Sequence, residues 1–248
     1  MDFQHGTNYK DKKVLRIMRI LGLQSITRRK KKRYRKVAAV ITAENILNRK
    51  FEATAPNQKW VTDVTEFKTP EGRKLYLSAI LDLYYRSVIA YMIRHRNNNA
   101  LVFETFDMAV INNDVSNLIF HSDRGYQYTS PAFKDKLKCN KITQSMSRPG
   151  YCIDNGLIEG FWGILKSEVY YNQNYESKEE LIQAVDKYIN FYNNERPQRR
   201  FNKQTPIQVR LSALLNKDNI TQYPVTKNNT LIKYFEKFNK TKEQYAII

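Results

Sequence analysis

The sequence predicts an α/β protein in which a mixed β-sheet is covered by helices. Three stretches rich in β-branched and aromatic residues come first, between residues 60 and 93. Helical and strand-like patterns then alternate as far as residue 193, an order typical of sheets flanked by helices. A chain of 248 residues is long enough to bury on the order of 70% of its unfolded surface, so it needs no disulfide to stabilise it.

Five strands are expected, each a short run of β-forming residues. They lie at residues 60–67, 75–83, 87–93, 118–120 and 142–145. The first three follow one another directly, with a turn signal at Pro70-Glu71-Gly72, and are expected to form a meander. The last two alternate with helical sequence, which suggests a mixed sheet covered by helices.

The expected helices show apolar residues at helical spacing. They lie at residues 100–111, 130–137, 155–170 and 178–193. Pro131 suits the first turn of the second of these helices, because its missing N–H would lack an intrahelical partner there. After Pro206 the pattern weakens, and residues 226–248 are polar and rich in lysine.

The positive charge is concentrated at the beginning of the chain. The formal net charge is +18, and residues 1–55 contain 15 Lys and Arg against 4 Asp and Glu. A short amphipathic helix is expected over residues 12–23, followed by a dense basic run of Arg28, Arg29, Lys30, Lys31, Lys32 and Arg33. Such a run either serves solubility alone or neutralises the phosphates of a nucleic acid, and we favour the second interpretation.

Several function classes are disfavoured by composition. The two cysteines, Cys139 and Cys152, form no Cys/His pattern typical of zinc sites or of secreted disulfide scaffolds. No run approaches the ~18 apolar residues that a membrane span requires. The first residues lack the features of a signal peptide, so the protein is expected to be cytoplasmic and not associated with a membrane.

Three acidic residues stand out by their positions. Asp63 lies within an expected strand, where Asp is rare and costly unless paired or bound to a metal. Asp123 follows the apolar run 118–120, and active sites of α/β sheets favour the ends of strands. Glu159 lies near the start of an expected helix, beside its apolar face, and Lys166 follows two turns later on the same side.

Carboxylates from a strand centre, a strand end and a helix can converge on one point. Their hard oxygen atoms suit Mg²⁺ or Mn²⁺, and two such ions can promote phosphodiester chemistry. Taken singly, each residue has a plainer explanation as a turn or helix-capping residue. Other residues nearby have expected structural roles: His121 supports the site, Asp82 is a buried hydrogen-bonded acid, and Asp154 and Asn155 cap the helix of Glu159.

Several motifs together resemble those of insertion-sequence transposases with a retroviral-integrase-like core. In chain order they are NILNRKF (45–51), WVTDVT (60–65), HSDRGYQYTS (121–130), SMSRPG (145–150), DNGLIEGFWGILKSE (154–168), YNNERP (192–197) and TP (205–206). Thirty-five residues separate Asp123 from Glu159, which is the interval of the family's Asp-Asp-Glu pattern. The resemblance covers about residues 10–211.

The resemblance implies an RNase H-like core that cuts and joins DNA strands at transposon ends. It assigns metal binding to Asp63, Asp123 and Glu159, with Mg²⁺ or Mn²⁺ as cofactor, and a DNA contact to Lys166. Arg148 and Arg124 flank this site and are expected to hold phosphates. The implied partners are double-stranded DNA and further copies of the chain, on the chromosome of a bacterial cell.

The expected organisation has three parts. Residues 1–55 form a basic DNA-binding arm, residues 56–211 the catalytic core and residues 212–248 an extension. Only the last helix of the family's helix-turn-helix-like module has a counterpart, at residues 12–23, which implies an upstream DNA-binding partner or fusion. Two alternatives remain: a nuclease with the same core that only hydrolyses DNA, and a shortened, inactive copy that binds DNA.

Overall fold

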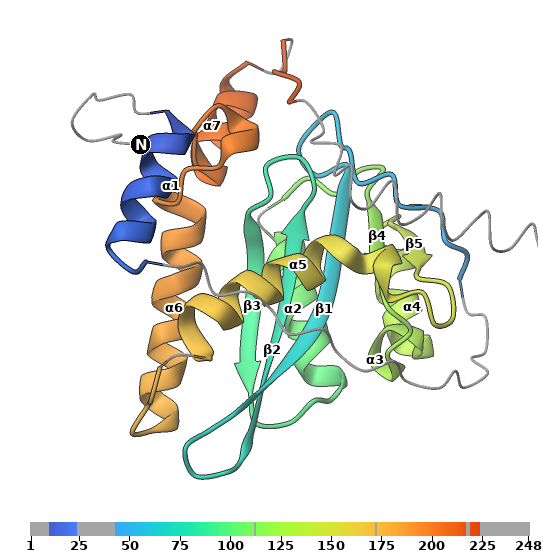
Figure 1. The fold of residues 1–248 in the computed structure, drawn as a ribbon. Coiled ribbons are helices and arrows are strands. Elements are labelled where there is room, and N and C mark those ends of the chain that lie inside the picture. Colours follow the sequence, from blue (N-terminus) through green and yellow to red (C-terminus); the bar gives the residue numbers. More distant parts are fainter. Residues whose placement is uncertain (1–9, 24–42, 112, 172, 217–218, 224–248) are drawn as a thin grey trace, which may run out of the picture. The chain divides into compact units, whose positions relative to one another are not determined.

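The computed structural model describes residues 10–23, 43–111, 113–171, 173–216 and 219–223 (Figure 1). Contacts divide the chain into two compact units, Met1–Arg35 and Lys36–Ile248. In the first unit, helix α1 spans Asp11–Ile20, which confirms the expected amphipathic helix. The basic run from Arg28 to Arg33 lies outside the described residues.

The second unit contains a mixed five-stranded sheet. Its strands are β1 (Lys59–Lys68), β2 (Lys74–Asp82), β3 (Val88–Arg94), β4 (Ile119–Ser122) and β5 (Thr143–Met146). The spatial order is β3-β2-β1-β4-β5, with β1, β2 and β3 antiparallel and β4 and β5 parallel to β1 and to each other. The meander and the mixed character of the sheet were expected from the sequence.

Helices surround the sheet. The α-helices of this unit are α2 (Asn99–Ile111), α3 (Tyr126–Thr129), α4 (Pro131–Cys139), α5 (Gly156–Leu165), α6 (Lys178–Asn194) and α7 (Pro206–Leu215). The expected helix over 155–170 is therefore shorter as an α-helix, because a π-helical turn, Lys166–Tyr170, follows α5 directly. Helices α3 and α7 were not expected; α7 begins with a capping box between Thr205 and Gln208.

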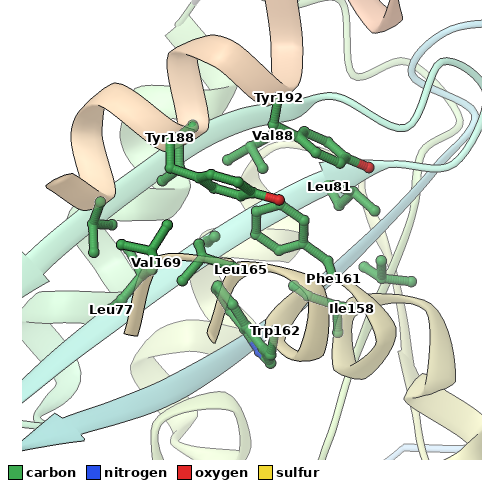
Figure 2. Close-up of a cluster of buried hydrophobic side chains, with 14 of the residues drawn as sticks. Leu77, Leu81, Val88, Ile158, Phe161, Trp162, Leu165, Val169, Tyr188 and Tyr192 are labelled. Atoms are coloured by element: carbon green, nitrogen blue, oxygen red, sulfur yellow. The ribbon is translucent and has the colours of Figure 1, made fainter. Parts of the chain in front are cut away.

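Each face of the sheet carries its own hydrophobic core. On one face, side chains of β1, β2 and β3 pack against α5 and α6, and Figure 2 shows Leu77, Leu81 and Val88 of the sheet together with Phe161 of α5 and Tyr192 of α6. On the other face, the core contains side chains of the sheet, α2 and α4, among them Trp60, Ile80, Phe106, Phe120 and Phe133. The domain is thus a sheet between two layers of helices.

The alternation of side chains along β1 places the acidic residue at its centre. Val61 and Phe67 belong to the core on the α5 side, whereas Trp60 belongs to the opposite core. Successive residues of a strand point to opposite faces, so Asp63 shares the face of Val61. Its carboxylate is consequently presented to helix α5.

Segments outside the predicted core limits also pack on this unit. Leu47 is buried in the core on the α5 side, and its N–H donates to the Ser145 hydroxyl at 2.9 Å. At the other end, α7 continues beyond residue 211, and Tyr223 packs edge-on against Phe201. The three-part division at residues 55 and 211 stays a prediction. In the part of the chain described, no helix is long and apolar enough to cross a membrane.

Candidate active site

The ladder between β1 and β4 places two of the predicted carboxylates together. The register pairs run from Lys59↔Ile119 to Val61↔His121. Asp63 lies on β1 two residues beyond the last pair, and Asp123 lies two residues beyond it on the other side, directly after the end of β4. Neighbouring parallel strands run in the same direction, so both acids leave the ladder at the same edge. The Asp123 carboxylate accepts a hydrogen bond from the Gly125 N–H at 2.8 Å.

Helix α5 brings the third carboxylate to this edge. Glu159 lies in its first turn and is partly exposed. The helix is joined to β1 by two hydrogen bonds: Asn155 Nδ2 donates to the Thr62 carbonyl at 2.9 Å, and Trp162 Nε1 donates to Asp63 Oδ2 at 3.0 Å. The sequence positions of these two donors flank Glu159, so the helix is anchored on both sides of its acid.

The electrostatics of Asp63 reflect this grouping. The pKa of Asp63 is raised to about 7, first by burial, then by the charge of Asp123 and to a smaller extent by that of Glu159. Hydrogen bonds from Val64 and Trp162 act in the opposite direction. Burial also raises the pKa of Asp123. Among the described residues, no three His, Cys, Asp or Glu side chains are gathered closely enough to enclose a metal ion.

The expectation that Asp154 and Asn155 cap α5 is wrong. Asn155 occupies the N-cap position, but its side chain makes no capping bond and reaches β1 instead. The fully buried Asp154 carboxylate pairs with Arg148 Nε at 2.8 Å and with Arg49 Nε at 2.6 Å. It also accepts from Asn45 Nδ2 at 2.9 Å. The loop before Glu159 is thereby tied to residues 45–49.

Two further polar residues have the structural roles expected of them. His121 is fully buried between two hydroxyls, with Nδ1 2.9 Å from Ser145 Oγ and Nε2 3.2 Å from Ser147 Oγ. Burial lowers the pKa of His121 to about 4, so it is neutral at physiological pH. The buried Asp82 carboxylate accepts from the N–H groups of Asn57 and Tyr84 and from the Trp60 indole. Asp82 organises a turn and lies outside the carboxylate group.

The structure also places the predicted DNA contacts. Lys166 follows α5, with its Nζ 5.2 Å from the centre of the Phe67 ring. Arg148 donates from Nε and Nη2 to the Asp154 carboxylate while its side chain stays 42% exposed, and Arg124 Nε donates to the Ser147 carbonyl at 2.7 Å. Arg28, Arg29, Lys30, Lys31, Lys32 and Arg33 lie outside the described residues.

Sequence reasoning did not identify Trp162 as the partner of Asp63. Its position on the apolar side of α5 predicted a core residue, and Trp162 is indeed almost fully buried beside Phe161. The indole nitrogen of Trp162 was the signal that could have predicted a polar partner, because a buried indole N–H needs a hydrogen-bond acceptor.

Comparison with known proteins agrees with this architecture. Two family profiles, both of the integrase core domain, match residues 53–152 and residues 159–214. An uncharacterized transposase-like protein of Haemophilus influenzae is 41% identical over 203 residues, which are 82% of this chain and 94% of that protein. The putative transposase InsK for insertion sequence element IS150 of Escherichia coli is 41% identical over 210 residues, which are 84% and 73% of the two chains.

Solved structures agree on the fold. The HTLV-2 integrase catalytic core domain, in complex with magnesium, has a TM-score of 0.51 and 20% identity, covering 63% of this chain and 98% of that one. A chain of the simian T-cell lymphotropic virus intasome has a TM-score of 0.56 and 19% identity, covering 90% and 72%. The predicted RNase H-like fold is thus confirmed.

Fold and profiles together define a polynucleotidyl transferase with an integrase core. On the identity and coverage of its relatives, the chain belongs to the insertion-sequence transposases, enzymes of the Asp-Asp-Glu type.

Proposed function

We propose that Asp63, Asp123 and Glu159 hold two divalent metal ions, Mg²⁺ or Mn²⁺, and that this site cuts and joins DNA at the ends of an insertion sequence. The observation that carries the proposal is that β1, the end of β4 and α5 bring their acids to one edge of the sheet, near enough for the charges of Asp123 and Glu159 to raise the pKa of Asp63. All three provide the hard oxygen ligands that these cations prefer.

The mutual repulsion of these acids supports the same assignment. A buried carboxylate with like-charged neighbours is unfavourable unless it is protonated or neutralised by a cation. When bound, two divalent ions activate the attacking hydroxyl and stabilise the leaving oxygen of a phosphodiester. The role of the chain's own residues is to present six carboxylate oxygens from rigid segments, with Asp63 held by Trp162 and Asp123 by the Gly125 N–H.

The proposed reaction has two balanced steps. In the first, water attacks the phosphorus at a transposon end, the bond to the 3′ oxygen breaks, and a 3′ hydroxyl and a 5′ phosphate form. In the second, that 3′ hydroxyl attacks a phosphodiester of target DNA, forms a new P–O bond, and releases a target 3′ hydroxyl. The same carboxylate group serves both steps.

The proposed partner is double-stranded DNA. Lys166, Arg148 and Arg124 contact phosphates near the cut, and the basic run 28–33 adds affinity without sequence reading. Residues 1–55 act as the DNA-binding arm, 56–211 as the catalytic core and 212–248 as an extension. The active form is a homo-oligomer that bridges two ends, working in the bacterial cytoplasm with an upstream helix-turn-helix partner or fusion.

The test uses the full chain, labelled DNA carrying the ends of its element, target DNA and Mn²⁺, with and without the upstream DNA-binding protein. Joined products that are lost with Asp63→Asn, Asp123→Asn and Glu159→Gln are expected. The control Asp107→Asn changes an exposed acid that pairs with Lys136 and should leave joining intact. Cleavage without joining would instead indicate a hydrolytic nuclease. Binding without cleavage, even with the upstream protein, would indicate an inactive copy.

A further inference from the structure

One side chain links the helix of Glu159 directly to the carboxylate of Asp63. Trp162 Nε1 donates to Asp63 Oδ2 at 3.0 Å. The indole itself is 5% exposed and packs against Phe161, with the ring centres 5.2 Å apart. Figure 2 shows Trp162 among the buried side chains of α5, which belong to the core on one face of the sheet. Because the ring is enclosed by the core, its N–H has a fixed direction.

The position of α5 relative to β1 is fixed at a second point. Asn155, which is 2% exposed, donates from Nδ2 to the carbonyl of Thr62, the residue before Asp63. The hydroxyl of Thr62 shares a hydrogen bond of 3.1 Å with Tyr128, which lies in the short helix after Asp123. Thr62, the residue before Asp63, is therefore hydrogen-bonded both to the segment that bears Glu159, through Asn155, and to the segment that follows Asp123, through Tyr128.

We propose that Trp162 is a positioning residue that fixes the rotamer of the metal ligand Asp63 through its indole N–H; this inference rests on the proposed function. An indole nitrogen donates and never accepts a hydrogen bond, so it favours the ionised carboxylate. It uses one of about four lone-pair sites of that group, and others remain for a cation. A donor that orients a metal ligand in this way typically contributes 10–100-fold to metal affinity or activity.

The chain contains a matched control for this interaction. Its other tryptophan, Trp60, lies on β1 and donates from Nε1 to Asp82 Oδ2 at 3.1 Å. That carboxylate also accepts from the backbone of Asn57 and Tyr84 and lies outside the proposed site. Trp60→Phe and Trp162→Phe thus each remove one indole-to-carboxylate bond from a buried ring, but only the second bond involves a proposed ligand.

The experiment measures Mn²⁺ binding by the full chain from the loss of the free Mn²⁺ signal in electron paramagnetic resonance, with thermal unfolding to check folding. We expect Trp162→Phe to bind Mn²⁺ about 10–100-fold more weakly and Trp60→Phe to bind within about twofold of the unchanged chain. Raising Mn²⁺ should restore cleavage by Trp162→Phe, because the ligands themselves are intact. A folded Trp162→Phe variant with unchanged Mn²⁺ affinity would overturn the proposal.

A second readout does not depend on the folding of Trp162→Phe. In Trp60→Phe, Trp162 is the only tryptophan, and paramagnetic Mn²⁺ should quench its fluorescence over the same concentrations at which Mn²⁺ binds. Adding Asp63→Asn should abolish that quenching. Bound Mn²⁺ without quenching would contradict the inference. Unchanged Mn²⁺ binding by Asp63→Asn would instead contradict the proposed metal site, so the two failures are distinguishable.

Discussion

Asp63 and Asp123 each lie two residues past Val61↔His121, the last register pair of two neighbouring parallel strands, Asp63 within β1 and Asp123 directly after β4. Pairing between β1 and β4 ends before the acids, whereas β1 remains paired with β2 through Asp63↔Ala79. The two carboxylates therefore lie where the sheet opens between β1 and β4, and α5 adds Glu159 beside them. This arrangement explains why the charges of Asp123 and Glu159 add to the effect of burial on the pKa of Asp63.

Replacing Asp63 should stabilise the metal-free protein while abolishing catalysis. The folded-state pKa of about 7 lies above the ordinary value of 3.8, so between these values the folded state holds more protons. Stability from this group is thus present at low pH and lost as the pH rises from about 4 to 7. In EDTA at pH 8, Asp63→Asn should gain about 1–3 kcal/mol, which raises Tm by roughly 2–12 °C.

Tm is measured against pH for the unchanged chain and for Asp63→Asn, and the difference between the two curves gives the contribution of the Asp63 carboxyl to stability. This subtraction is necessary because His121, whose pKa burial lowers to about 4, contributes an opposite slope over an overlapping range. Saturating Mg²⁺ should stabilise the unchanged chain and not the variant. Equal profiles of Tm against pH for the two proteins would contradict the raised pKa of Asp63 in the folded chain.

Asp154→Ala should be strongly destabilising. Burial alone would raise the pKa of Asp154, but hydrogen bonds from Arg148 and Arg49 lower it to about 2. Removing the carboxylate leaves both arginines without this partner, at a cost of about 3–5 kcal/mol. Urea unfolding checks this, with Asp107→Asn as an exposed-pair control expected to change stability by less than about 1 kcal/mol.

The lowered pKa adds a pH signature to the same experiment. The contribution of Asp154 is present above its ordinary pKa of 3.8 and is lost as the pH falls toward about 2. The stability difference between Asp154→Ala and the unchanged chain should therefore shrink over that range. A small, pH-independent effect would mean that the arginines find other partners.

Lys166→Ala should weaken binding of end DNA without unfolding the protein. If Lys166 contacts a phosphate, the slope of log affinity against log salt concentration should decrease by about one. The lost contact with the Phe67 ring should cost no more than about 1 kcal/mol of stability. Lys136→Ala removes an equal charge that is already paired with Asp107 and serves as the control. Equal salt slopes for all three proteins would remove Lys166 from the interface.

Neutralising the run from Arg28 to Arg33 with glutamine should lower affinity for all DNA sequences alike. Six fewer phosphate contacts correspond to a decrease of up to about five in the salt slope. Filter binding to specific and unrelated duplexes over a salt series measures this change. Loss of binding to end DNA alone would show that the run reads sequence.

The sequence by itself determined the fold class, the five strands and the candidate carboxylates. Alternation and helical spacing record which face of an element is buried, so β1 and the expected helix around Glu159 were recognisable. The motifs around Asp63, Asp123 and Glu159 were sufficient to predict the family. Short helix α3 was missed because so few residues carry no clear period.

Only the tertiary structure decided which polar groups meet. Asp154 and Asn155 have the chemistry of capping residues. In the folded chain, however, Asp154 accepts hydrogen bonds from Arg49 and Arg148, and Asn155 donates to the Thr62 carbonyl. Trp162 reads as a core residue, yet its N–H holds Asp63 across 99 positions of sequence. A local pattern describes which face of an element is apolar, whereas a hydrogen bond between distant segments depends on register and packing that exist only once the chain has folded.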